Sequence, residues 1–238
     1  MYRLLRILLA LFVCVTMGAI VGCEEENPAE AENELQQANL FSIAVGHHWV
    51  FNAYALDTTN NQKILNSDHR EASYVQGTTT VAGKTAYRMI DSTYRPNGSI
   101  ESIDTTYIAV ENGSLFLLFT EVSQNLWVKF FDASAGVNNE YTGGQFQVQD
   151  GGIIFTATFK GKIYPKEMVT VPAGTIEAYK TEIKISVAFA GQTYEWLDQQ
   201  IYFAEGYGPI KMSFPVRLEF GEDIKSFGSE SLLVSKNF

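Results

Sequence analysis

The histidines are candidates for chemistry, because imidazole is a common metal ligand and general base. The chain has three histidines, and two of them, His47 and His48, are adjacent. Adjacent residues on a strand point to opposite faces, so both could bind one metal ion only if the backbone bent between them. No His-x-His or His-Glu-x-x-His spacing occurs in the chain, although spacings of this kind place two imidazoles on one side. We therefore expect no metal site.

Signatures of an activated nucleophile are missing as well. The chain contains neither Gly-x-Ser-x-Gly nor Ser-x-x-Lys, the patterns that place a reactive serine beside its base. The glycine pairs Gly143-Gly144 and Gly151-Gly152 precede predicted strands rather than helices, so they do not predict a phosphate-binding loop. Six aspartates lie at predicted turns without the spacing of a calcium loop: Asp57, Asp68, Asp91, Asp104, Asp132 and Asp150. The sequence thus predicts a protein that is not an enzyme and needs no cofactor.

Cys23 is the one residue whose surroundings predict a specific modification. It follows Ile20-Val21-Gly22, at the end of an apolar run that begins at Ile7. This arrangement resembles a bacterial lipobox, with isoleucine in place of the usual leucine. The resemblance implies cleavage before Cys23, acylation of its sulfur and its amine, and anchoring of the protein in a membrane. The alternative is an ordinary signal peptide with an accidental cysteine.

The residues before Cys23 read as a secretory signal peptide over residues 1–22. Arg3 and Arg6 precede the apolar run, as in a signal peptide with a basic start. The run is too short for a spanning helix, which needs about 20 apolar residues. Three glutamates, Glu24 to Glu26, then end it abruptly.

Composition excludes several classes of partner. The 238 residues carry a formal charge of −10, and loss of Arg3 and Arg6 with the signal peptide makes the charge near −12. An acidic surface of this kind argues against nucleic acid and against docking on anionic lipid headgroups. Contact with the membrane must then come from the lipid on Cys23. Because Cys14 leaves with the signal peptide, no disulfide is expected and the fold must depend on its apolar core.

The segment after Cys23 predicts a tether. Residues 23–39 are rich in Glu, Asn, Ala and Gln and carry few large apolar side chains. Such a composition cannot bury enough surface to offset the entropy lost on ordering, so we expect a disordered acidic linker. A single folded domain is then expected over residues 40–238.

The domain has the pattern of an all-β protein. Short runs rich in aromatic and β-branched residues alternate with turn residues to the C-terminus. Asn97-Gly98 and Asn112-Gly113 predict hairpin turns of type I′, which need two residues with positive φ. Two long runs, Thr175–Phe189 and Thr193–Phe203, predict a hairpin longer than usual. We expect an antiparallel half-barrel or strongly curved sheet in a single domain.

At most one or two short helices are expected beside these strands. Ala31–Gln37 and Ser123–Trp127 are the segments where a turn or two of helix fits the residues.

Three motifs resemble one group of envelope proteins. Residues Val171–Lys180 read VPAGTIEAYK, Tyr202–Lys211 read YFAEGYGPIK, and Phe41–Phe51 read FSIAVGHHWVF. These segments are similar to signatures of uncharacterised Gram-negative envelope lipoproteins, the TapB-like proteins, with the pattern VPAGTF…GxGxxK. The chain departs from the group's residues at three positions, which are Ser42 for Pro, Ile176 for Phe and Tyr207 for Val. The resemblance implies an envelope lipoprotein and supplies no activity.

The aromatic residues are the remaining feature from which to predict a function. On the concave face of a curved sheet they would form a site for a lipid-like ligand or for part of a partner protein, in a non-enzymatic binding module. The alternatives are that they fill the core of a domain without disulfides, and that the protein is a structural or assembly module of the envelope without a small ligand. The residues predicted to contact a ligand are Trp49, Trp127, Tyr179, Trp196, Phe203 and Tyr207.

We expect the protein in the outer membrane, facing the periplasm or the exterior.

Overall fold

The computed structural model describes residues 39–57, 69–119, 125–150, 153–189, 192–214 and 228–238, together with Leu35. Within these ranges the chain forms twelve β-strands and one turn of 3-10 helix. Leu35 is helical, and the other residues of the helix expected over residues 31–37 lie outside the described residues. None of the described segments is a helix long and apolar enough to cross a bilayer. The strands are β1 His48–Leu56, β2 His69–Val81, β3 Lys84–Tyr94, β4 Ile100–Glu111, β5 Ser114–Phe119, β6 Leu126–Asp132, β7 Glu140–Asp150, β8 Ile153–Val171, β9 Gly174–Phe189, β10 Gln192–Ala204, β11 Gly208–Phe214 and β12 Gly228–Lys236; the 3-10 helix η1 is Ala133–Ala135.

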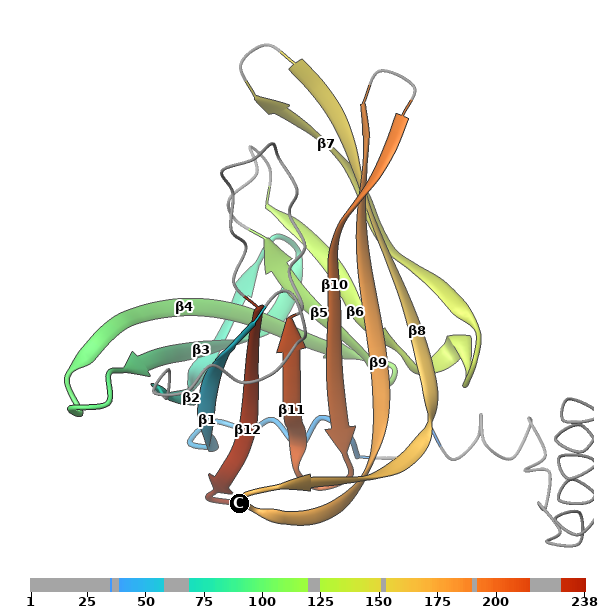
Figure 1. The fold of residues 1–238 in the computed structure, drawn as a ribbon. Coiled ribbons are helices and arrows are strands. Elements are labelled where there is room, and N and C mark those ends of the chain that lie inside the picture. The colour runs from blue at the N-terminus through green and yellow to red at the C-terminus, as the bar shows by residue number, and fades with distance from the viewer. Residues whose placement is uncertain are drawn as a thin grey trace, which may run out of the picture.

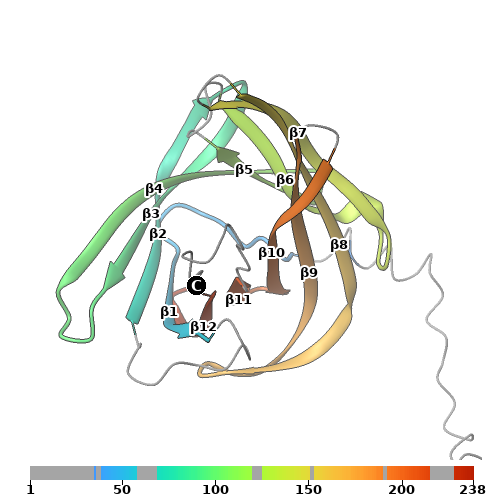
Figure 2. The same cartoon turned by 45° about the horizontal axis from the view of Figure 1, so that its top comes forward.

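All twelve strands belong to one antiparallel sheet with the order β6-β5-β4-β3-β2-β1-β12-β11-β10-β9-β8-β7. Apart from β6 and β7, strands that follow one another in the chain are neighbours in the sheet, and β1 pairs with β12 in its middle. The two edges are therefore β6 and β7, which are joined through η1. The sheet curls until these edges come together, giving a nearly closed barrel (Figures 1 and 2). The predicted single, strongly curved all-β sheet is confirmed.

The backbone conformation matches the predicted type I′ turn at one of the two Asn-Gly hairpins and differs from it at the other. Asn112 and Gly113 both have positive φ, 51° and 73°, as a type I′ turn requires. At the Asn97-Gly98 turn only Gly98 has a positive φ. The Gly98 amide donates to the Arg95 carbonyl at 2.8 Å. Pro96 lies inside that turn and fixes a negative φ. The type I′ prediction is thus wrong for Asn97-Gly98.

The helix expected over residues 123–127 is also not found where the structure describes the chain. Leu126 and Trp127 begin strand β6, because they pair with Phe119 and Leu118 of β5. The described 3-10 turn lies later, at η1, where the Asp132 side chain accepts a hydrogen bond from the amide of Ser134. This turn was not among the helical segments expected from the sequence.

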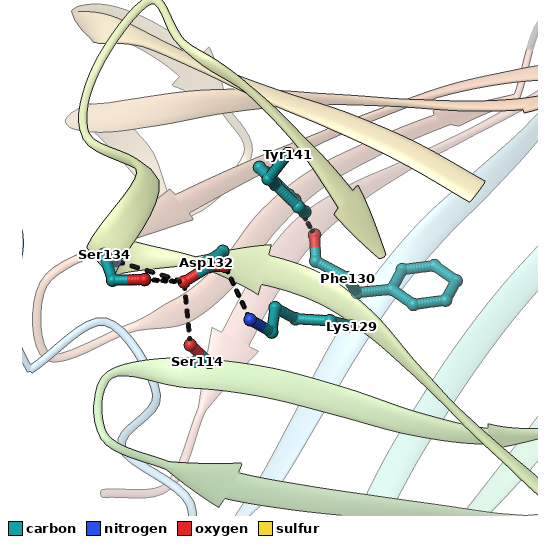
Figure 3. Close-up of polar contacts among 6 residues, drawn as sticks. All are labelled: Ser114, Lys129, Phe130, Asp132, Ser134 and Tyr141. Atoms are coloured by element: carbon teal, nitrogen blue, oxygen red, sulfur yellow. Dashed lines mark hydrogen bonds and ion pairs between the residues drawn. The ribbon is translucent and has the colours of Figure 1, made fainter. Parts of the chain in front are cut away.

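Side chains, rather than a described strand ladder, join β6 to β7. The Tyr141 hydroxyl of β7 donates to the Phe130 carbonyl of β6 at 2.6 Å (Figure 3). The Tyr141 ring lies against Gly161 of β8, where a Cβ atom would overlap it. Burial, with the nearby Asp132 carboxylate, raises the pKa of Tyr141 above its usual range. The hydroxyl therefore stays protonated and keeps its role as a donor.

A second polar cluster lies beside this contact, around the buried side chain of Asp132. Its carboxylate accepts from the Lys129 ammonium at 2.6 Å, the Ser134 hydroxyl at 2.6 Å and the Ser114 hydroxyl at 3.2 Å (Figure 3). Burial alone would raise the pKa of Asp132, but these hydrogen bonds and the lysine charge hold it below its usual value. The cluster ties β5, β6 and η1 together at the seam between β6 and β7.

One half of the barrel interior is filled by aromatic residues. Phe159 packs against Phe119 and Phe146 at centroid distances of 5.2 and 5.6 Å. Phe41, from the segment before β1, makes edge-on contacts with Phe131 and Phe203, each at 5.1 Å. Residues 39–43, which we call the lumenal segment, thus pack against the interior (Figure 2).

Packing begins before the expected start of the domain. Leu35 is 1% exposed and belongs to the same core cluster as Leu40, which is 2% exposed. Leu35 lies within the stretch expected to be a tether. Its large apolar side chain is an exception in that polar stretch, and this explains why it is drawn into the core.

We expect Tyr141→Phe to lower the free energy of unfolding by about 1–3 kcal/mol, because it leaves the buried Phe130 carbonyl without its donor. Urea unfolding measures the change. The matched control is Tyr74→Phe on β2, where the side chain is 46% exposed and little change is expected. Equal stability of the two variants would show that this hydrogen bond does not hold the barrel closed.

Candidate functional site

The other half of the barrel interior contains a cavity of about 410 Å³. This volume is many times the roughly 30 Å³ that one water molecule occupies, and it lies in the usual range for small-molecule sites. The lining comes from the lumenal segment, from β1 to β5 and from β10 to β12. Its apolar members are Phe41, Ile43, Trp49, Phe51, Ala72, Met89, Ile108, Leu115, Phe203, Pro209, Met212 and Phe214.

Strand register explains why these residues share one face. Alternate residues of a strand point to the same side, and directly paired residues on neighbouring strands do so too. Trp49 of β1 pairs with Ser73 of β2, and Phe51 pairs with Glu71. All four line the cavity. On the other side of β1, Phe51 pairs with Leu233 of β12, and a bulge lies between Val50 and Phe51.

Trp49 is the most firmly fixed of the lining residues. It is 1% exposed, and its indole Nε1 donates to the Tyr207 carbonyl at 2.7 Å. Its ring meets Phe238 edge-on at 5.1 Å and packs against the backbone of Gly208, where a Cβ would sit 3.3 Å from Nε1. These contacts hold the indole in place, so this part of the cavity is formed without a ligand.

Two carboxylates stand among the apolar residues. Glu71 accepts from the Ser231 hydroxyl at 2.7 Å, and Asp91 accepts from the Ser73 hydroxyl at 2.6 Å. Both carboxylates and both serines line the cavity. No described Lys, Arg or His side chain forms an ion pair with Glu71 or Asp91. The cavity therefore has a broad apolar surface and a negatively charged region.

The ligand-contact residues predicted from the sequence divide between the two halves of the barrel and its outside. Trp49 and Phe203 line the cavity. Tyr179 is 3% exposed and packs in the filled aromatic half. Tyr207 contributes its carbonyl to Trp49, while its ring lies under the Lys236 ammonium at 4.6 Å.

Trp127 lies away from the cavity. It pairs with Leu118 on the face opposite to the lumenal Val128, and its indole donates to the Ala82 carbonyl at 3.1 Å. Cys23 and the side chain of Trp196 fall outside the described residues. Two of the six residues predicted to contact a ligand, Trp49 and Phe203, thus line the cavity. The predicted lipidation site lies outside the described residues.

Sequence reasoning missed the two carboxylates. Glu71 lies in strand β2, where an acid usually faces water, and Asp91, which was expected at a turn, lies inside strand β3. The available signal was weak: Glu71 lies four residues before Val75, and Asp91 lies two residues after Met89, so each acid shares a strand face with an apolar side chain.

The described residues contain no cluster of three His, Cys, Asp or Glu side chains able to hold a metal ion. His47 donates from Nδ1 to the Ser42 carbonyl at 2.9 Å, and its ring stacks on Phe238 at 4.1 Å. His69 lies on β2, 3.2 Å from a carboxylate oxygen of Glu101. These contacts give His47 a packing role and place His69 beside a carboxylate.

Comparison with known proteins gives the fold and no activity. No protein-family model matches the chain, and no curated protein does. A solved structure of a candidate lipoprotein from Parabacteroides distasonis is similar, with 14% identity, a TM-score of 0.51, and coverage of 84% of this chain and 99% of that one. A candidate exported protein with a YmcC-like fold from Bacteroides fragilis has 11% identity, a TM-score of 0.50, and coverage of 84% and 100%. Likeness at this identity shows a shared barrel-like fold.

Proposed function

We propose that this protein is a lipoprotein of the cell envelope that binds an apolar, lipid-like ligand inside its barrel and has no enzymatic activity. The observation that carries the proposal is the cavity of about 410 Å³, which lies beside a filled half of the same interior. A barrel that only needed a core would be packed throughout, since protein interiors are usually close-packed. Here two clusters of buried side chains fill much of the interior, and members of both clusters surround the remaining space.

The proposed anchor is a lipid on Cys23. The sequence before it has the order of a lipoprotein signal, and the acidic chain supplies no basic patch for membrane binding. One acyl chain gives marginal binding, whereas two or more give stable anchoring. The two structural relatives are named as a candidate lipoprotein and a candidate exported protein, which supports the same compartment.

The nature of the lining supports a ligand with an apolar body. Phe51, Phe203 and Phe214 present aromatic surface to the cavity, and Met212 adds a flexible apolar side chain. Burial of apolar surface contributes about 25 cal/mol per Å². Because Trp49 is already held in place, little of this energy is spent on ordering the site.

A second candidate function is that of an assembly module that contacts a partner protein. It is favoured by one observation, the exposed hairpin of β3 and β4 that extends from the barrel (Figure 1). Ile100 and Ile103 near its tip are 52% and 58% exposed. Exposed apolar side chains that lie close together are common at protein interaction sites.

We expect Cys23→Ser to abolish incorporation of a fatty-acid label, because Cys23 is the proposed acceptor. The measurement is metabolic labelling with an alkyne analogue of palmitate, followed by detection on the purified protein. Cys14→Ser is the matched control, since it changes the chain's other cysteine and lies within the proposed signal peptide. Retention of the label by Cys23→Ser, or its loss in Cys14→Ser, would contradict the proposed anchor.

We expect Ser229→Phe to weaken binding of an apolar probe by at least tenfold, because the new ring would occupy the cavity that Ser229 lines. Titration of a fluorescent lipid probe into the chain from Glu24 to the C-terminus, which keeps every described residue, measures the affinity. The control is Ser235→Phe, an exposed position on the same strand. If the parent chain shows no saturable binding, the ligand proposal fails and the assembly function is preferred.

A further inference from the structure

We propose that the cavity selects amphiphiles whose polar head is a protonated amine, with the apolar tail held by the aromatic side of the same cavity. This inference rests on the proposed ligand-binding function and specifies the class of ligand. The charges of the lining carry it. The charged side chains that line the cavity are Glu71 and Asp91, and both are acidic.

Each carboxylate is held by a serine of the cavity and keeps capacity for further donors. Ser231 donates to an oxygen of Glu71, and Ser73 donates to an oxygen of Asp91. A carboxylate has about four acceptor positions, so one hydroxyl leaves most of them available. The serines fix where the oxygens lie, and they supply no positive charge.

Register places the two carboxylates within reach of one head group. Ser73 lies directly opposite Asp91, and Glu71 lies directly opposite Thr93. Glu71 and Asp91 are therefore diagonal neighbours on the lumenal face, and such positions are roughly 7–8 Å apart. An ammonium group has three donors, so a single protonated amine between the two side chains can contact both.

The energetics favour a cation at this place. Two like charges in a partly enclosed space repel more strongly than they would in water, because the effective dielectric constant is lower. A bound ammonium group is attracted to both carboxylates, and these two attractions offset the repulsion between them. It also forms charge-assisted hydrogen bonds, which are stronger than neutral ones. The same carboxylates repel a carboxylate or phosphate head. The cavity should thus reject fatty acids and anionic phospholipids.

The apolar tail has its own surface next to this acidic region. Phe51 pairs directly with Glu71 across β1 and β2, so an aromatic ring adjoins the first carboxylate. Met89 lies two residues before Asp91 on β3 and also lines the cavity. A chain that enters with its amine at the carboxylates can therefore extend over aromatic and aliphatic side chains.

The test compares three ligands with the same C12 tail at pH 7, each used below the concentration at which it forms micelles or separates from solution. They are dodecylamine, dodecanol and laurate, titrated into the chain from Glu24 to the C-terminus in a calorimeter. We expect dodecylamine to bind at least tenfold tighter than dodecanol, and laurate to bind more weakly than dodecanol. Added salt should weaken the binding of dodecylamine and leave that of dodecanol nearly unchanged.

The double variant Glu71→Gln/Asp91→Asn should lose the preference for dodecylamine and keep its affinity for dodecanol. Its control is Glu140→Gln/Glu205→Gln, which removes the same charge at exposed positions outside the cavity lining and should keep the preference. The two single variants, Glu71→Gln and Asp91→Asn, serve if the double variant does not fold.

The outcomes separate the two proposals. Equal binding of the three ligands by the parent chain, or a preference that survives removal of both carboxylates, would overturn the inference and leave the ligand-binding function in place. Absence of saturable binding for all three ligands would overturn the ligand-binding function and the inference together.

Discussion

The meeting of β6 and β7 is the constraint on which the rest of the structure depends. An open sheet of twelve strands has two edges with unpaired backbone groups, and such edges invite contact with other chains. Here the two edges are consecutive in the chain, because the terminal strands β1 and β12 pair in the middle of the sheet. The Tyr141 hydroxyl, bonded to the Phe130 carbonyl, joins them where no described ladder does. Gly161 makes this possible, since a larger residue would displace the tyrosine ring.

Closure creates an interior that is used in two ways. Next to the seam, aromatic side chains such as Phe130 and Phe159 fill the space and supply the core that a chain without an expected disulfide needs. Away from the seam, β1, β2, β11 and β12 surround the cavity. Phe41 and Phe203 lie between these regions, because both belong to the filled cluster and both line the cavity. The aromatic residues are therefore core and binding surface at once, rather than one or the other.

The sequence predicts the class of fold well, because the class follows from local patterns. Alternating residues and turn residues such as Asn112-Gly113 require little knowledge of the distant chain. Closure of the barrel is different, since it depends on a contact across the two edges of the sheet. The site also depends on such long-range detail. Trp49 and Trp127 look alike in sequence, yet one lines the cavity and the other lies on the opposite face of the sheet. Glu71 was missed because an acid in a strand usually faces water.

The most direct test of the account is to measure which tryptophan a bound ligand touches. The chain has three tryptophans, so replacing Trp196 and one of the other two by Phe leaves either Trp49 or Trp127 as the single reporter. Bromine on an alkyl chain quenches indole fluorescence on contact. A brominated dodecylamine should quench the Trp49 protein saturably and leave the Trp127 protein unaffected, because Trp49 lines the cavity and Trp127 does not. Quenching of Trp127 without quenching of Trp49 would show that the ligand binds outside the barrel and would contradict the account.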